Sequence, residues 1–101
     1  MSNDVTFTKD DIQTFQDMVD NQVFYLGRGV DLTERKRGDH TVEVSFDRKG
    51  KHLALVEMVA HRDYSRITAP IEAIVTRRYT FNDRHGEYQL HGEITRKIEN
   101  K

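Results

Sequence analysis

Two runs of alternating residues near the end of the chain constrain the fold most strongly. Apolar or aromatic side chains recur with period two over residues 71–81 and again over residues 88–98, and the polar segment 82–86 separates the runs. Successive side chains of a β-strand point to opposite faces of a sheet. The pattern therefore predicts an antiparallel hairpin with one buried face.

The expected register of this hairpin places chemically compatible residues opposite one another, because directly opposed side chains stabilise a sheet. The predicted apolar pairs are Phe81 with Tyr88, Tyr79 with Leu90 and Val75 with Ile94; the predicted polar pairs are Thr80 with Gln89 and Glu72 with Lys97. The same register places Arg77 opposite Gly92, where the glycine leaves room for a long side chain.

Earlier segments indicate three further strands. Residues 41–46 alternate between apolar and polar types, which predicts a strand with one wet face. Residues 53–60 are apolar at almost every position, which fits either a buried central strand or a short core helix; the preceding turn and the strand at 41–46 favour a strand. Residues 23–32 suggest a first strand, bent near Gly27 and Gly29. Residues 34–39 and 63–69 are expected to be exposed connections.

One helix is predicted over residues 9–20. Thr8 can cap it, and Asp11 at the third helical position completes a capping box. The side chains of Ile12, Phe15, Met18 and Val19 form the apolar stripe expected to face the core. Asp20 and Asn21 suggest its end.

These elements predict one α+β domain over residues 1–101, in which an N-terminal helix packs on a curled antiparallel meander of about five strands. That arrangement is similar to the cystatin-like one. The likeness is an architectural analogy only, because no motif in the chain carries it, and a fold does not fix a function.

Composition points to a thin core. Only 36% of the residues are hydrophobic and 33% are charged. A thin core fits either a lone, marginally stable domain or a chain that completes its core against a second copy. Because two-fold dimers are the commonest soluble oligomers, we favour a homodimer in which Val56, Met58 and Ala60 of the doubly apolar strand contribute to the interface. The absence of cysteine, of a signal-peptide pattern and of a long apolar run leads us to expect a cytoplasmic protein.

Two arginines are unusual for their expected position. Alternation places Arg77 and Arg96 on the same inward face of the final hairpin, and a buried guanidinium needs a carboxylate or an anionic ligand. Glu57 is the natural carboxylate partner. The alternative is a pocket for a small anion with Tyr79 and Tyr88 in its wall.

No pattern in the chain indicates catalysis, a cofactor or a metal site. The five histidines lack the short fixed spacing of metal motifs. We therefore expect a non-catalytic protein-binding or assembly module, which could be an accessory or inhibitory protein. RNA or single-stranded DNA binding through a basic, aromatic sheet face is a second hypothesis, and the small-anion pocket is a third.

Overall fold

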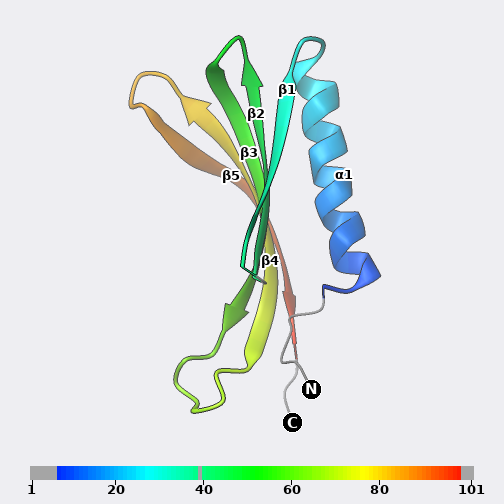
Figure 1. The fold of residues 1–101 in the computed structure, drawn as a ribbon, viewed down its shortest axis with the longest axis vertical. Helices are drawn as coiled ribbons and strands as arrows, with labels where there is room; N and C mark the ends of the chain where they lie inside the picture. Colours follow the sequence, from blue (N-terminus) through cyan, green and yellow to red (C-terminus); the bar gives the residue numbers. More distant parts are fainter. Residues whose placement is uncertain (1–6, 39, 99–101) are drawn as a thin grey trace.

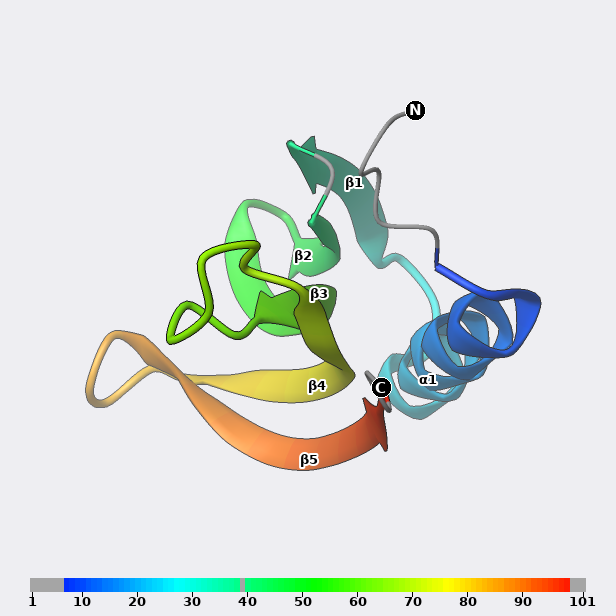
Figure 2. The same ribbon diagram turned by 90° about the horizontal axis from the view of Figure 1, so that it is seen from below.

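The computed structural model describes residues 7–38 and 40–98. A helix, α1 (Lys9–Leu26), is followed by the strands β1 (Asp31–Arg37), β2 (Thr41–Arg48), β3 (Lys51–Arg62), β4 (Ile71–Asn82) and β5 (Glu87–Lys97). The strands form one antiparallel sheet in chain order, with β1 and β5 at its edges. Figures 1 and 2 show that the twisted sheet curves and that α1 lies along one of its faces. The predicted α+β meander is confirmed.

Helix α1 begins where the sequence predicts and ends later. The Thr8 side chain accepts a hydrogen bond from the backbone N–H of Asp11, and the Asp11 carboxylate accepts one from the backbone N–H of Thr8, which completes the capping box. The predicted end at residues 20–21 is wrong, because Val23 and Leu26 also pack against the core. Gly27 ends the helix with a φ of 81°, and its N–H donates to the carbonyl of Val23.

The buried face of α1 differs from the predicted stripe. Phe15 and Val19 are buried as expected, but Ile12 is 52% exposed. Asp11 and Gln22 are buried instead. Polar residues therefore occupy both ends of the face that meets the sheet.

The segment after the helix corrects two predictions. Residues 23–26 are helical rather than extended, and the two glycines near them form a turn instead of a bend within a strand. Arg48 at the end of β2 secures this turn, since its guanidinium donates to the carbonyl oxygens of Leu26, at 2.7 Å, and Arg28, at 3.0 Å. The expected connection at residues 34–39 largely belongs to β1, whose seven residues are all exposed. An exposed edge strand has no apolar alternation, so the pattern missed it.

The core lies between α1 and the middle of the sheet. Phe46, Ala54 and Val56 are fully buried, and Met58, Ile74 and Phe15 are nearly so. Strand β3 is extended, as predicted, and is the third of the five strands. Its even-numbered residues face α1, and its burial alternates along residues 53–60. The neighbouring β2–β3 turn uses Lys49 and Gly50 at φ angles of 51° and 79°, as a tight two-residue hairpin requires.

The β4–β5 register agrees with the prediction only near the turn. Phe81 pairs with Tyr88, Tyr79 with Leu90 and Thr80 with Gln89, as predicted. The register then shifts between Arg78 and Tyr79, which leaves His91 as an extra residue on β5. Beyond the bulge the predicted pairs are wrong: the observed pairs are Arg78 with Gly92, Thr76 with Ile94, Val75 with Thr95 and Ala73 with Lys97.

Candidate functional site

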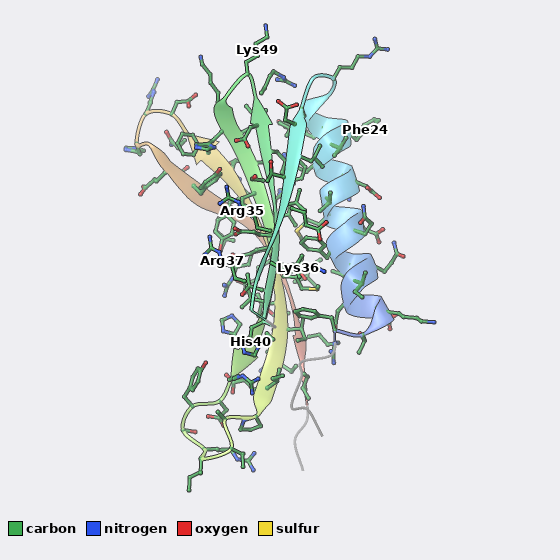
Figure 3. The ribbon with its side chains drawn as sticks, viewed as in Figure 1. Phe24, Arg35, Lys36, Arg37, His40 and Lys49 are labelled. Carbon is green, nitrogen blue, oxygen red and sulfur yellow. The ribbon has the colours of Figure 1, made fainter. Side chains whose placement is uncertain are left out.

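The face of the sheet that points away from α1, called the outer face below, carries most of the candidate residues. Alternation from the buried residues of β3 places Leu55, Glu57 and Val59 on this face, with their β4 partners Tyr79, Arg77 and Val75 beside them. On β1, Arg35 and Arg37 project to the side of the sheet opposite α1 (Figure 3). No described helix covers this face (Figure 2).

One row of charged residues crosses the outer face through all five strands. The row, called the charged row below, consists of Arg35, Glu43, Glu57, Arg77 and Glu93, each opposite the next in the observed register. Two carboxylates are thus adjacent at the centre of the row. Like charges directly opposite one another destabilise a sheet. The adjacent carboxylates of Glu43 and Glu57 therefore need cations beside them.

Arginines on both sides supply those cations. Arg77 Nε lies 2.8 Å from Glu93 Oε2, and Arg77 Nη1 lies 3.6 Å from Glu57 Oε2. Arg37 Nη2 lies 3.1 Å from Glu43 Oε1. The hydrogen bond to Glu93 holds the pKa of Arg77 above its usual value. Each of the three carboxylates of the row therefore lies within 4 Å of an arginine.

Tyr79 is joined to the same set. Its hydroxyl donates to Glu57 Oε2 at 2.7 Å. Burial raises the pKa of Tyr79 most, and the hydrogen bond to the Glu57 carboxylate adds to the rise. The phenol therefore stays protonated at neutral pH and acts as a hydrogen-bond donor.

An aromatic group occupies the end of the outer face near the β4–β5 turn. The ring centroids of Phe81 and Tyr88 are 5.1 Å apart, and those of His52 and Phe81 are 5.3 Å apart. His52 Nδ1 lies 2.7 Å from Asp47 Oδ1. Burial, with the nearby Asp47 charge as a smaller cause, raises the pKa of Tyr88. A hollow of about 340 Å³ lies beside the rings, between Tyr88 and the side chains of β1 to β3.

The structure brings together three of the five predicted ligand-binding residues. Glu57, Arg77 and Tyr79 are in contact in the charged row, while Tyr88 lies on the same face beside the hollow. The prediction that Arg77 and Arg96 share the inward face is wrong. Arg77 lies on the outer face with Tyr79, and only Arg96 faces α1. Arg96 pairs with the buried Ile74, which faces α1, because the bulge at His91 reverses the faces of the following residues.

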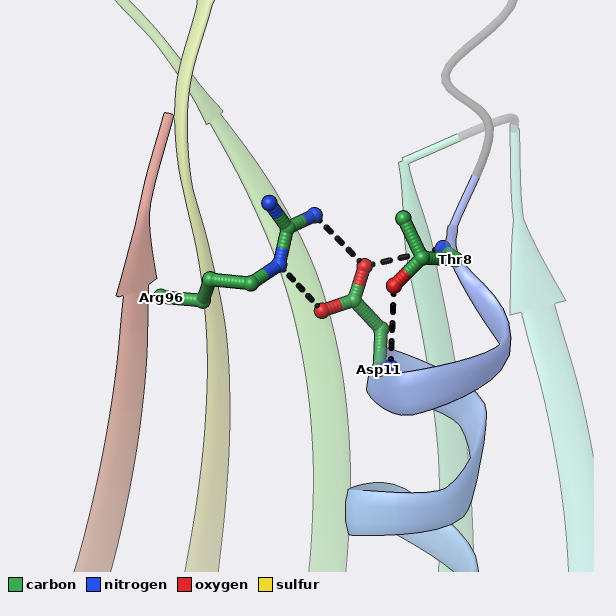
Figure 4. A network of polar contacts seen from close by, with 3 residues as sticks. All are labelled: Thr8, Asp11 and Arg96. Atoms are coloured by element: carbon green, nitrogen blue, oxygen red, sulfur yellow. Dashed lines mark hydrogen bonds and ion pairs between the residues drawn. The ribbon is translucent and has the colours of Figure 1, made fainter. Parts of the chain in front are cut away.

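Arg96 is instead bound to the start of the helix. Its Nε and Nη2 each lie 2.7 Å from one oxygen of the Asp11 carboxylate, and Thr8 also contacts that carboxylate (Figure 4). The Arg96 hydrogen bond is the main cause that lowers the pKa of Asp11, and Asp11 in turn raises the pKa of Arg96. A bidentate arginine–carboxylate pair of this kind is strong and directional. It fastens α1 to β5 on the side of the sheet opposite Arg77, so the two arginines do not share an anion site.

The predicted interface residues lie in the core of this chain. Val56, Met58 and Ala60 are 0%, 2% and 6% exposed and face α1. They are not available to a partner, which corrects the interface assignment. The opposite side of β3, with Leu55 and Val59 half-buried, is the accessible one.

Sequence reasoning missed the outer members of the charged row. The alternation pattern does not show that Arg35, Glu43 and Glu93 form one row, because it assigns residues 34–39 to a connection and gives a register for the final hairpin alone. A register for all five strands would have revealed the row, because each member is opposite the next.

Comparisons of the chain with protein-family models, curated proteins and solved structures found no match. Within residues 7–38 and 40–98, no helix has the length and apolar content needed to cross a membrane. The same residues contain no group of three or more histidine or acidic side chains placed to hold a metal ion.

Proposed function

We propose that this protein is a non-catalytic assembly module that forms a homodimer through the outer face of its sheet. The observation that carries the proposal is the composition of that face, where apolar side chains flank the charged row. The aliphatic and aromatic side chains around the row are Leu55, Val59, Tyr79, Phe81, Tyr88 and Leu90. Leu90 is 52% exposed. Apolar side chains left without a covering layer are typical of contact surfaces.

Face-to-face packing of two sheets suits this arrangement. Sheets that pack in this way lie about 10 Å apart, with their strands roughly aligned. A second sheet would cover the side chains of Leu55 and Val59 as α1 covers Val56 and Met58 on the other side of the same strand. The added burial would compensate for a core that is thin in a chain with 36% hydrophobic residues.

The order of charges in the row favours a second copy as the occupant. A two-fold rotation about an axis parallel to the strands places β1 over β5 of the second copy and β2 over β4. Arg35 then meets Glu93 of the second copy, and Glu43 meets Arg77 of the second copy. The row is thus complementary to itself under this rotation, as an isologous interface requires.

Mass measurement by light scattering at micromolar concentration tests the proposal. We expect twice the chain mass of 11.9 kDa. Leu55→Asp should reduce the mass to that of one chain, because it places an unpaired carboxylate at the centre of the interface. The matched control is Phe24→Asp, because Phe24 is 91% exposed on the side of α1 away from the sheet (Figure 3). A monomeric parent chain would overturn the proposal, and a dimer split only by Phe24→Asp would move the interface to the helix.

A charge-exchange experiment tests the axis. Arg35→Glu and Glu93→Arg should each weaken the homodimer, since each places like charges opposite one another twice. An equimolar mixture of the two variants should form a heterodimer, because both contacts then regain opposite charges. Failure of the mixture to associate more strongly than either variant alone would contradict the arrangement.

A substitution at Glu57 tests whether the two-fold axis passes through the centre of the charged row. The two Glu57 carboxylates approach each other at the axis of the proposed dimer. Glu57→Gln should therefore strengthen association several-fold, because it removes like-charge repulsion while keeping an acceptor for Tyr79. Weaker association in this variant would argue against a two-fold axis near β3.

The nucleic-acid hypothesis has weaker support from the same face. Arg37 and Arg77 are already paired with carboxylates, which makes them less available to phosphates. Salt-sensitive RNA or single-strand binding that is lost in the double variant Arg77→Ala and Arg78→Ala would favour it instead. A cytoplasmic location, and a role as an accessory or inhibitory protein, belong to the same proposal and fit a chain without cysteine.

A further inference from the structure

A groove of about 460 Å³ runs between α1 and β5, on the opposite side of the sheet from the proposed dimer interface. Helix residues Asp17, Met18 and Asn21 line one side of it, and Gly92 and Ile94 of β5 line the other. Arg78 of β4 contributes to the lining from within the sheet. The volume is within the range of small-molecule pockets, about 300 to 1,000 Å³.

Arg78 differs from the two arginines that the sequence singled out. Arg77 and Arg96 each bind a carboxylate at less than 3 Å, with distances of 2.8 and 2.7 Å. Among the described residues no ion pair reaches Arg78, and its only hydrogen bond is a long one, 3.4 Å from Nη2 to the carbonyl of His91. Its Nε is buried and has no hydrogen-bond partner. A buried donor without a partner is costly. Among the described residues, Arg78 is the one arginine or lysine with such an atom.

The bulge at His91 creates the space beside this guanidinium. It moves Gly92 opposite Arg78, where any larger side chain would occupy part of the groove. A Cβ added at Gly92 would lie 3.8 Å from Arg78 Nε. The next groups along a longer side chain would therefore take the place that a ligand needs.

We propose that this groove binds a small carboxylate with a short apolar chain. The carboxylate accepts hydrogen bonds from the Arg78 guanidinium, and the Asn21 amide can donate to the same group. Met18 and Ile94 supply apolar contact for the chain of the ligand; Ile94 is 52% exposed and would gain cover. The groove opens on the helix side of the sheet and needs no dimer, although Glu93 of its lining also belongs to the charged row.

Two acidic residues in the lining set the balance of charge. Glu93 is held by Arg77, at 2.8 Å, so its charge is already compensated. Asp17 accepts a hydrogen bond from the neutral amide of Gln13, at 2.7 Å, and no cation among residues 7–38 and 40–98 forms an ion pair with it. The negative charge of Asp17 should therefore limit the affinity of the groove for a carboxylate. Removing this charge should strengthen binding, whereas removing the charge of Arg78 should weaken it.

Titration of the ¹⁵N-labelled chain with hexanoate, followed by NMR and calorimetry, tests the proposal. We expect saturable binding with shifts at the Arg78 Nε–H and at the amides of Gly92 and Ile94. Hexylamine, which has the same chain and the opposite charge, should not bind. Absence of saturable hexanoate binding to the parent chain would overturn the proposal.

Variants assign the binding to the groove. Arg78→Met should weaken hexanoate at least about tenfold, since it removes a charged hydrogen-bond donor, and Asp17→Asn should strengthen it several-fold. Gly92→Leu should block the site by filling it. Arg84→Met, in the exposed β4–β5 turn, is the matched control. Circular dichroism melts show whether each variant is folded; binding that persists unchanged in folded Arg78→Met and Gly92→Leu would place the ligand elsewhere.

Discussion

At the scale of single residues, the contact between Asp11 and Arg96 connects the start of the helix to the last strand across 85 positions of sequence. The sequence identified Asp11 as part of a capping box and Arg96 as an inward cation needing a partner. It did not connect them, because the bulge that turns Arg96 toward the helix has no signal in the alternation. The same carboxylate thus both caps α1 and fixes its position on the sheet.

The Asp11–Arg96 pair predicts acid sensitivity. The folded-state pKa of Asp11 is below its unfolded value of about 3.9, mainly because of Arg96. The contribution of the Asp11 carboxylate to the free energy of unfolding is fully present above its unfolded-state pKa. This contribution is lost as the pH falls through the folded-state pKa. Asp11→Asn should lower the unfolding free energy at pH 7 by about 2 kcal/mol and flatten its decline below about pH 4. Urea unfolding at several pH values measures both effects, with the exposed Asp20→Asn as control.

Tyr79 gives a second prediction at this scale. Tyr79→Phe removes the donor to Glu57 and leaves that carboxylate with Arg77, at 3.6 Å, as its remaining partner. We expect a loss of about 1 kcal/mol in unfolding free energy. Tyr64→Phe is the matched control, since Tyr64 is 81% exposed. Equal stability of the two variants would show that the Tyr79 hydrogen bond contributes nothing net.

At the scale of elements, the boundary errors have one cause. Residues 23–26 contain Val23 and Tyr25, which favour strands locally, yet they are helical because Val23 and Leu26 reach the core and Arg48 binds the carbonyl of Leu26. Strand β1 lacks the alternation that would predict it, because none of its residues is buried. Pairing with β2, and not a local preference, makes these residues extended.

The bulge in β5 is the element with the largest effect on the proposed sites. It places Arg96 on Asp11, Gly92 beside Arg78 and Glu93 beside Arg77. Deletion of His91 should remove the register shift and turn the residues after it to the opposite face. We expect a loss of at least about 2 kcal/mol, because the Arg96 contact is lost. Chemical denaturation measures the loss; His91→Ala, which keeps the residue count at this exposed position, should change stability by less than about 0.5 kcal/mol.

At the scale of the whole molecule, the two faces of β3 have different roles. Val56 is fully buried against the helix, whereas its neighbour Leu55 is half-buried on the outer face. Val56→Asp should unfold the chain, because an unpaired carboxylate in the core costs several kcal/mol. Leu55→Asp should leave the fold intact. Circular dichroism distinguishes them; a folded Val56→Asp chain with half the parent mass would restore Val56 to an interface.

The pattern of residues along the chain is enough to predict the class of fold, the start of the helix, the central position of β3 and the hairpin register next to the turn. Each of these depends on interactions between near neighbours, such as capping, alternation and tight turns, which leave a pattern along the chain. The tertiary structure alone decided where α1 ends, that β1 is a strand, and which face carries Arg96 and Arg78. Those outcomes depend on contacts between distant segments and on one extra residue in β5, and a shift of a single residue reverses the faces of a strand without changing its pattern.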